Sequence, residues 1–111
     1  MNHRKPDVHL TERHIGVLRD VLRRHADQIE HVGVFGSRAA GHARPNSDID
    51  LIVHGRVDQA LVDRLWTEFS ESGLEVSVDV VGDGLISHEA LMEQIRQTER
   101  PLFVQSDFDV S

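Results

Sequence analysis

Hydrophobic positions recur along the chain with two different periods, which predict alternating helices and strands. Apolar residues spaced three or four positions apart predict helices at 11–27, 58–71 and 87–98. Short β-branched runs and strict alternation predict strands at 31–35, 48–53, 74–81 and 102–104, with a helical turn at 37–42 and a loop at 43–47. This order favours an α/β (α+β) protein in which one open sheet is covered by helices on one face.

Acidic residues occupy one side of two of these predicted strands. In the strand at 48–53, Asp48 and Asp50 alternate with apolar residues and therefore share one face. In the strand at 74–81, the valines point one way and Asp79 points the other. Because the apolar sides must face the helices, we expect the three carboxylates on the uncovered face of the sheet.

A cluster of three carboxylates is electrostatically unfavourable unless a cation lies among them, because each raises the pKa of the others. The cluster therefore indicates a divalent cation. Oxygen ligands in a chain without cysteine favour Mg²⁺ or Mn²⁺ over structural zinc. Mg²⁺ is typically held by one or two carboxylates, water and substrate phosphate oxygens, which fits a nucleoside triphosphate site.

A Gly-Ser turn follows the strand predicted at 31–35. Gly36 allows the backbone to approach a phosphate closely. Ser37 offers a hydroxyl and a backbone N–H at the start of the helical turn, and Arg38 adds positive charge. We therefore expect Gly36, Ser37 and Arg38 to bind the phosphates of the substrate.

The turn and the carboxylates together predict a catalytic site. Two metal ions between Asp48 and Asp50 can bridge an incoming nucleophile, the α-phosphate and the departing pyrophosphate. Asp79 is expected to complete the metal that carries the nucleophile and to help deprotonate that nucleophile.

Composition and charge limit the classes of partner. A length of 111 residues favours one domain at 11–104, between a flexible N-terminus at 1–10 and a mobile acidic tail at 105–111. A formal net charge of −7 without a long basic tract argues against direct nucleic-acid binding. No segment approaches the ~20 apolar residues of a membrane span. The lack of cysteine fits a cytoplasmic setting.

The segment GSRAAGHARPNSDIDLIV at 36–53 resembles the signature of the polymerase-beta-type nucleotidyltransferase superfamily. That signature is a Gly-Ser pair, a spacer, D-x-D, and a third Asp on a later strand; here the spacer is ten residues. The segment is particularly similar to the minimal nucleotidyltransferases of the MNT group, and the resemblance covers most of 11–104. It implies the nucleotidyltransferase fold, a small mixed sheet with helices packed on one face and carboxylates on the other. It also implies ATP as the substrate and two Mg²⁺ ions, with Mn²⁺ as a substitute.

The third Asp of the signature has neighbours that are alternatives. Glu75 and Asp83 lie close to Asp79 along the chain. Strand parity favours Asp79 over Asp83, because Asp83 falls in a Gly-flanked turn.

Members of the MNT group are frequently antitoxins whose partner is a helical HEPN-type ribonuclease toxin. The resemblance implies that this chain transfers AMP from ATP to a tyrosine of such a toxin, in a hetero-oligomer, and releases pyrophosphate. A chain this short has no room for a separate acceptor domain, which independently favours an acceptor presented by another protein. Two alternatives stay open: an antitoxin that neutralises its toxin by binding alone, and nucleotidyl transfer to a small molecule.

Overall fold

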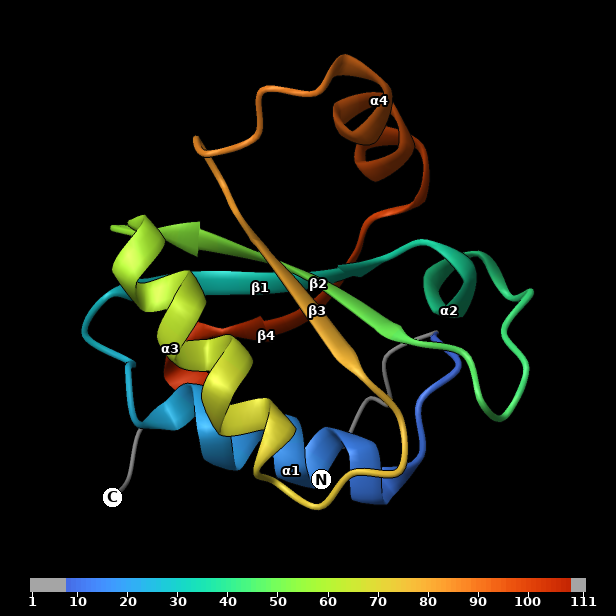
Figure 1. Cartoon of the computed structure of the whole chain (residues 1–111), viewed down its shortest axis with the longest axis horizontal. Helices are drawn as coiled ribbons and strands as arrows, with labels where there is room; N and C mark the ends of the chain where they lie inside the picture. The colour runs from blue at the N-terminus through green and yellow to red at the C-terminus, as the bar shows by residue number, and fades with distance from the viewer. Residues whose placement is uncertain (1–7, 109–111) are drawn as a thin grey trace.

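The computed structural model describes residues 8–108, which form a four-stranded sheet with helices packed on it (Figure 1). The strands are β1 (Ile29–Phe35), β2 (Ile49–Gly55), β3 (Val78–Gly82) and β4 (Arg100–Val104). The helices are α1 (Glu12–Arg23), α2 (Ser37–Ala40), α3 (Gln59–Ser70) and α4 (Glu89–Thr98), followed by the 3₁₀ helix η1 (Gln105–Phe108).

The strand order across the sheet is β3-β2-β1-β4, and the sheet is mixed. β1 pairs in an antiparallel manner with both β2 and β4, whereas β2 and β3 run parallel. Parallel neighbours need a crossover connection, and α3 supplies it here. The predicted α/β fold class with a small mixed sheet is therefore confirmed.

α1 and α3 cover one face of the sheet and enclose the main hydrophobic core. Ile49, Leu51 and Val53 of β2 are fully buried in this core, as the alternation in the sequence predicts. The opposite parity of β2 then points away from α1 and α3, which is the side on which Asp50 lies.

Both long helices of this layer begin at a capping side chain. The Thr11 hydroxyl accepts a hydrogen bond from the backbone N–H of His14, and the Asp58 carboxylate accepts one from the N–H of Leu61. Each cap satisfies a backbone donor that the helix itself leaves free, and such caps stabilise by about 1 kcal/mol. The starts of α1 and α3 therefore agree with the predicted starts, because the signal is local.

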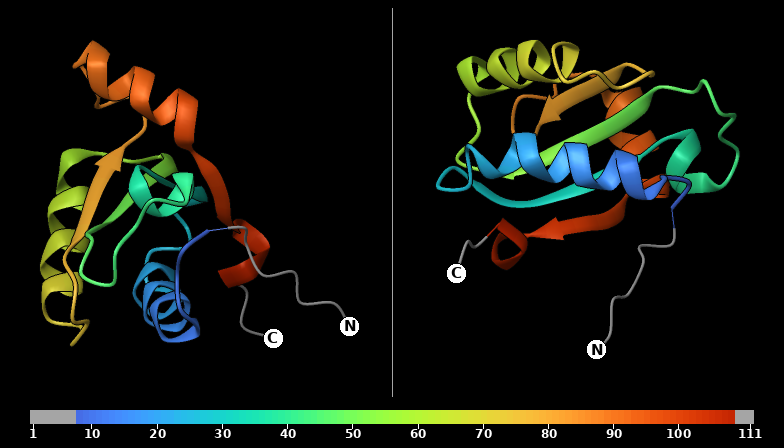
Figure 2. Two further views of the ribbon diagram at one scale, coloured as in Figure 1. Left: turned by 90° about the vertical axis from the view of Figure 1, so that its right-hand side faces the viewer. Right: turned by 90° about the horizontal axis from the view of Figure 1, so that it is seen from below.

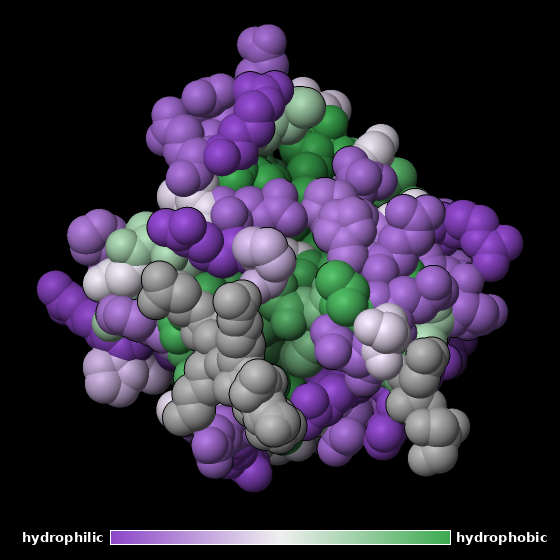
Figure 3. Space-filling view, turned by 180° about the vertical axis from the view of Figure 1, so that it is seen from behind, coloured by the Kyte–Doolittle hydropathy of each residue, from purple (hydrophilic) through white to green (hydrophobic). Residues whose placement is uncertain are grey.

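α4 packs on the second face of the sheet, which differs from the prediction that helices cover one face only. Ile95 of α4 forms a separate buried cluster with Phe35 and Ile52 of the central strands. The central strands therefore bury apolar side chains on both faces, and the second face needs its own cover. Figure 2 shows α4 and α1 on opposite sides of the sheet. Seen from behind, the surface is largely hydrophilic, with apolar side chains showing beside α4 at the top (Figure 3).

β3 is shorter than the strand predicted at 74–81. It begins at Val78, which pairs with Ile49 at the start of β2. Residues 74–77 precede the point at which β3 reaches its neighbour, so they alternate in sequence without forming a strand. Period-2 alternation reports which side a residue faces and does not report where a partner strand begins.

The ends of the described chain are packed onto the domain. Val8 and Leu10, predicted to belong to a flexible N-terminus, are partly buried against the core. Residues 105–108, predicted to begin a mobile tail, form η1 instead; Phe108 is buried and lies 5.5 Å from the ring of Phe103. Residues 1–7 and 109–111 lie outside the described residues. None of the helices within 8–108 combines the length and apolarity needed to cross a membrane.

Candidate active site

The register between β2 and β3 brings two of the predicted aspartates side by side. Asp50 pairs directly with Asp79 across the parallel ladder, and both side chains share one face of the sheet. Asp48 lies two residues before Asp50, just ahead of the first residue of β2. The N–H of Ile49 donates to the carbonyl of Ser77 at 2.9 Å, so the two chains already run together at this point.

The carboxyl of Asp50 is the most perturbed group of the site. Its pKa is raised from 3.8 to about 6. The largest cause is burial, followed by the charge of Asp79, a hydrogen bond with the Asp79 side chain and the charge of Asp48. Within residues 8–108, no Lys, Arg or His side chain forms an ion pair with any of the three aspartates. In the part of the chain that the structure describes, no ion pair therefore offsets the negative charge of the cluster.

Gly36 lies directly against this carboxylate at the end of β1. A Cβ atom at position 36 would lie 2.6 Å from Oδ2 of Asp50, and the backbone has φ of +76°. Both features require glycine, because a side chain would collide with the carboxylate and strain the backbone. The turn therefore places backbone without a side chain next to Asp50, where the sequence predicted a close approach of phosphate, and Gly36 itself is buried in the structure.

Ser37 opens α2 and is half-buried. Its hydroxyl makes no hydrogen bond within the described part of the chain, and its backbone carbonyl accepts from the N–H of His42 at 2.9 Å. The hydroxyl therefore remains available to a ligand beside Gly36.

Arg38 makes contacts that differ from the predicted contact with phosphate. The side chain is 4% exposed, and its guanidinium donates to the carbonyls of Ser47 at 2.8 Å, His9 at 2.7 Å and Pro45 at 3.3 Å. Backbone carbonyls of neighbouring segments therefore occupy its donors. In the structure Arg38 therefore supports the loop before Asp48, and its contact with phosphate stays a prediction.

The donor set of the site fits a hard cation. Among residues 8–108, no three His, Asp or Glu side chains already stand in an arrangement that holds a metal ion. The adjacent carboxylates of Asp50 and Asp79, with Asp48 exposed beside them, nonetheless offer the one or two carboxylates that Mg²⁺ takes when water and substrate phosphate supply its other ligands. A cation there would also relieve the repulsion that raises the pKa of Asp50.

Sequence reasoning missed the contribution of α4 to the turn. The backbone N–H of Gly36 donates to the hydroxyl oxygen of Thr98 at 2.9 Å, and that hydroxyl donates to the carbonyl of Gln94 at 2.7 Å. The last turn of α4 therefore fixes the Gly-Ser turn from the second face of the sheet. No spacing in the sequence indicates this contact, because 62 residues separate the two partners.

Comparisons with known proteins agree with this geometry. The profile of the family described as "Polymerase beta, Nucleotidyltransferase" matches residues 17–108. One chain of a crystal structure of a toxin–antitoxin with AMP-PNP is 25% identical, with a TM-score of 0.66; the match covers 84% of this chain and 77% of that chain. No curated protein matches the sequence.

Two further solved structures share the fold at lower identity. A chain of the MntA–HepT toxin–antitoxin is 23% identical with a TM-score of 0.61, and the match covers 84% of this chain and 74% of that one. A chain from the complex of a tri-AMPylated Shewanella oneidensis HEPN toxin with its MNT antitoxin is 22% identical with a TM-score of 0.60, covering 84% and 72%. The predicted resemblance to the MNT group is therefore confirmed at the level of fold.

The matched region contains the Gly36–Ser37 turn, Asp50 on β2, Asp79 on β3, and Asp48 directly before β2. This chain belongs to the polymerase beta nucleotidyltransferase family.

Proposed function

We propose that this chain is an antitoxin nucleotidyltransferase that transfers AMP from ATP to a tyrosine of a partner HEPN toxin. The observation that carries the proposal is the pairing of Asp50 with Asp79 beside the Gly36–Ser37 turn. Membership of the family supports nucleotidyl transfer as the reaction. The likeness to a toxin–antitoxin structure with AMP-PNP supports ATP as the nucleotide and a toxin as the partner.

Each residue of the site has a distinct role in this proposal. Asp48, Asp50 and Asp79 hold two divalent ions, Mg²⁺ or Mn²⁺, which when bound neutralise the charge that develops on the phosphate oxygens. Gly36 allows the triphosphate to approach the backbone, and the free hydroxyl of Ser37 donates to a phosphate oxygen.

The reaction is a displacement at the α-phosphorus of ATP. The tyrosine oxygen forms a bond to this phosphorus while the bond to the bridging oxygen of the β-phosphate breaks, so pyrophosphate leaves with the electron pair. Asp79 accepts the phenolic proton, because a carboxylate within reach of the nucleophile can act as general base. The AMP group would then be attached to the toxin by a phosphodiester bond.

The acceptor must come from outside the chain in this proposal. The tyrosine acceptor and the HEPN class follow from the MNT resemblance, and a tri-AMPylated HEPN toxin occurs in a complex that shares this fold. A hetero-oligomer of the two proteins would present the acceptor to the site.

The test is transfer of label to the toxin. The purified chain is incubated with MgCl₂, a HEPN-type toxin, and ATP labelled either at the α-phosphate or at the γ-phosphate. We expect label on the toxin from α-labelled ATP only, with loss of labelling when EDTA is added. Label from γ-labelled ATP would indicate phosphoryl transfer and overturn the proposal.

Matched variants separate catalysis from binding. Asp50→Asn and Asp79→Asn should abolish labelling and the neutralisation of the toxin, whereas Asp20→Asn on the exposed surface of α1 should leave both unchanged. Neutralisation that survives in Asp50→Asn would show that the chain acts by binding alone.

A further inference from the structure

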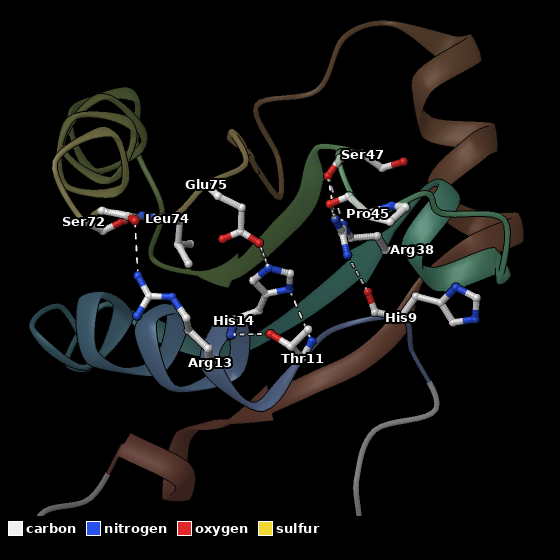
Figure 4. Close-up of polar contacts among 11 residues, drawn as sticks. His9, Thr11, Arg13, His14, Arg38, Pro45, Ser47, Ser72, Leu74 and Glu75 are labelled. Atoms are coloured by element: carbon white, nitrogen blue, oxygen red, sulfur yellow. Dashed lines mark hydrogen bonds and ion pairs between the residues drawn. The ribbon is translucent and has the colours of Figure 1, made fainter.

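The segment from His9 to His14, at the start of α1, contacts both loops that lead into the aspartate-bearing strands. Figure 4 shows His14 and Arg13 reaching the loop before β3, while Arg38 joins His9 to the loop before β2. These two loops are far apart in sequence, and the carboxylates that follow them must share one cation in the proposed function. The contacts therefore do not involve the three aspartates themselves, but the loops that precede them.

His14 makes two hydrogen bonds that fix its tautomer. Its Nδ1 accepts from the backbone N–H of Thr11 at 3.2 Å, so the ring proton is on Nε2, which donates to Oε2 of Glu75 at 2.9 Å. The imidazole is 3% exposed. The hydrogen bond from His14 lowers the pKa of the Glu75 carboxyl. One side chain thus completes the cap of α1 and holds the loop before β3.

The loop before β3 is tied down at two more points. Arg13 donates from Nη2 to the carbonyl of Gly73 at 3.2 Å. Ser77, two residues before Asp79, accepts from the N–H of Ile49, which lies between Asp48 and Asp50. A shift of this loop would therefore move Asp79 relative to β2.

Arg38 performs the equivalent task for the loop before β2. It bridges the carbonyls of His9 and Ser47, and its own carbonyl accepts from the N–H of His9 at 2.8 Å. Ser47 is adjacent to Asp48 in the chain. The same segment of the N-terminus is thus attached to both strands before they enter the site.

We infer that residues 9–14 form a positioning clamp that, through His14 and Arg38, sets the placement of Asp79 relative to Asp48 and Asp50. The inference rests on the proposed function, because the groups that it positions are the carboxylates of that site. Ligands from two strands bind one ion only when they are held within about 0.5 Å of the required geometry. Groups hydrogen-bonded directly to metal ligands change metal affinity by about 10- to 100-fold when they are removed, so a clamp that acts through a neighbouring loop should have an effect at the lower end of that range.

Two substitutions separate the two hydrogen bonds of His14. Asparagine places an oxygen near the position of Nδ1, so His14→Asn keeps the acceptor for Thr11 and loses the donor to Glu75. Glutamine places an N–H near the position of Nε2, so His14→Gln keeps the donor and loses the cap acceptor. If His14 acts through the loop before β3, the variant that loses the Glu75 contact should be impaired. If His14 only stabilises α1, the variant that loses the cap should be impaired.

The experiment measures Mn²⁺ affinity by EPR in the full-length chain with α,β-methylene-ATP. We expect His14→Asn and Glu75→Ala to weaken Mn²⁺ binding about 10-fold, and His14→Gln to stay within about twofold of the wild type. His25→Leu is the matched control: His25 bonds Glu68 at the same 2.9 Å distance, but neither residue touches the loops before β2 and β3. It should leave Mn²⁺ affinity unchanged.

Hydrogen exchange provides an independent readout in the same proteins. His14→Asn should speed exchange of amides in 72–79 about 10-fold, with His14→Gln close to the wild type. If His14→Asn keeps wild-type affinity, or if His14→Gln weakens it as much as His14→Asn does, the clamp is overturned. If the wild type binds no Mn²⁺, the proposed function fails, and exchange in 72–79 alone then supports or overturns the clamp.

Discussion

Replacement of Asp50 by asparagine tests whether the carboxylate cluster exists to bind a cation. Without metal, the Asp50 carboxylate is held next to Asp79 and Asp48, and its pKa is raised to about 6, first by burial and then by Asp79. Asparagine has nearly the same shape, carries no charge and can donate a hydrogen bond to Asp79. We therefore expect Asp50→Asn to stabilise the metal-free protein.

The magnitude follows from the pKa of Asp50. The difference between 3.8 and about 6 corresponds to about 3 kcal/mol for a fully desolvated carboxylate. The side chain is half-buried, so solvent screening reduces the expected gain to about 1–2 kcal/mol. For a domain of this size that gain corresponds to a rise in Tm of roughly 5–10 °C.

The sign of the pH dependence provides a second check. The folded protein binds the Asp50 proton more tightly than the unfolded chain, so its favourable contribution is complete below pH 3.8 and is lost as pH rises through about 6. The advantage of asparagine should therefore be full above pH 6, should shrink between about pH 6 and 3.8, and should vanish below that range.

The assay is urea unfolding of the wild type and Asp50→Asn in EDTA from pH 4 to pH 8, with Asp20→Asn as the control for loss of a surface carboxylate. Added Mg²⁺ should stabilise the wild type and leave Asp50→Asn unchanged. A variant that is less stable than the wild type at pH 7.5, by an amount that does not change toward pH 4, would refute the reasoning and make the carboxylate structural.

Three further substitutions test other parts of the site and fold. Gly36→Ala should lower the free energy of unfolding in urea by about 1–3 kcal/mol and abolish Mn²⁺ binding, because the new Cβ meets the Asp50 carboxylate and the backbone there is strained for any other residue. Gly84→Ala is the control: the backbone has φ of +86°, but no atom lies within 4 Å of the new Cβ, so Mn²⁺ binding should be kept. Phe108→Ala should cost about 3 kcal/mol, whereas a change below about 0.5 kcal/mol would mean that η1 is not packed. Arg38→Met should lower the free energy of unfolding by about 2 kcal/mol. Unchanged stability together with a raised KM for ATP would show instead that Arg38 binds phosphate.

The side that each aspartate faces could be predicted from the sequence. Alternation in DIDLIV places Asp50 opposite Leu51 in any strand, because successive side chains point to opposite faces of the backbone. The turn at Gly36 could be predicted as well, since a Gly-Ser pair after a strand is typical of a tight turn. The caps of α1 and α3 also depend only on residues a few positions apart.

The contacts of Arg38 and of α4 could not be predicted in this way. A loop arginine near a phosphate-binding motif is expected to meet phosphate, yet its guanidinium is used by carbonyls that only the folded chain brings around it. α4 covers Phe35 and Ile52 because those side chains emerge on the second face of the sheet. Neither fact has a local signature.

The sequence by itself determined the order of the main strands and helices, the face that each carboxylate takes and the position of the Gly-Ser turn, because those properties come from backbone geometry over a few residues. The tertiary structure alone decided that β3 starts at Val78, that Asp79 lies beside Asp50 and that α4 binds the Gly-Ser turn through a hydrogen bond to Gly36. Strand register is set by contacts between residues distant in the chain, and a shift of one residue would turn Asp79 to the opposite face.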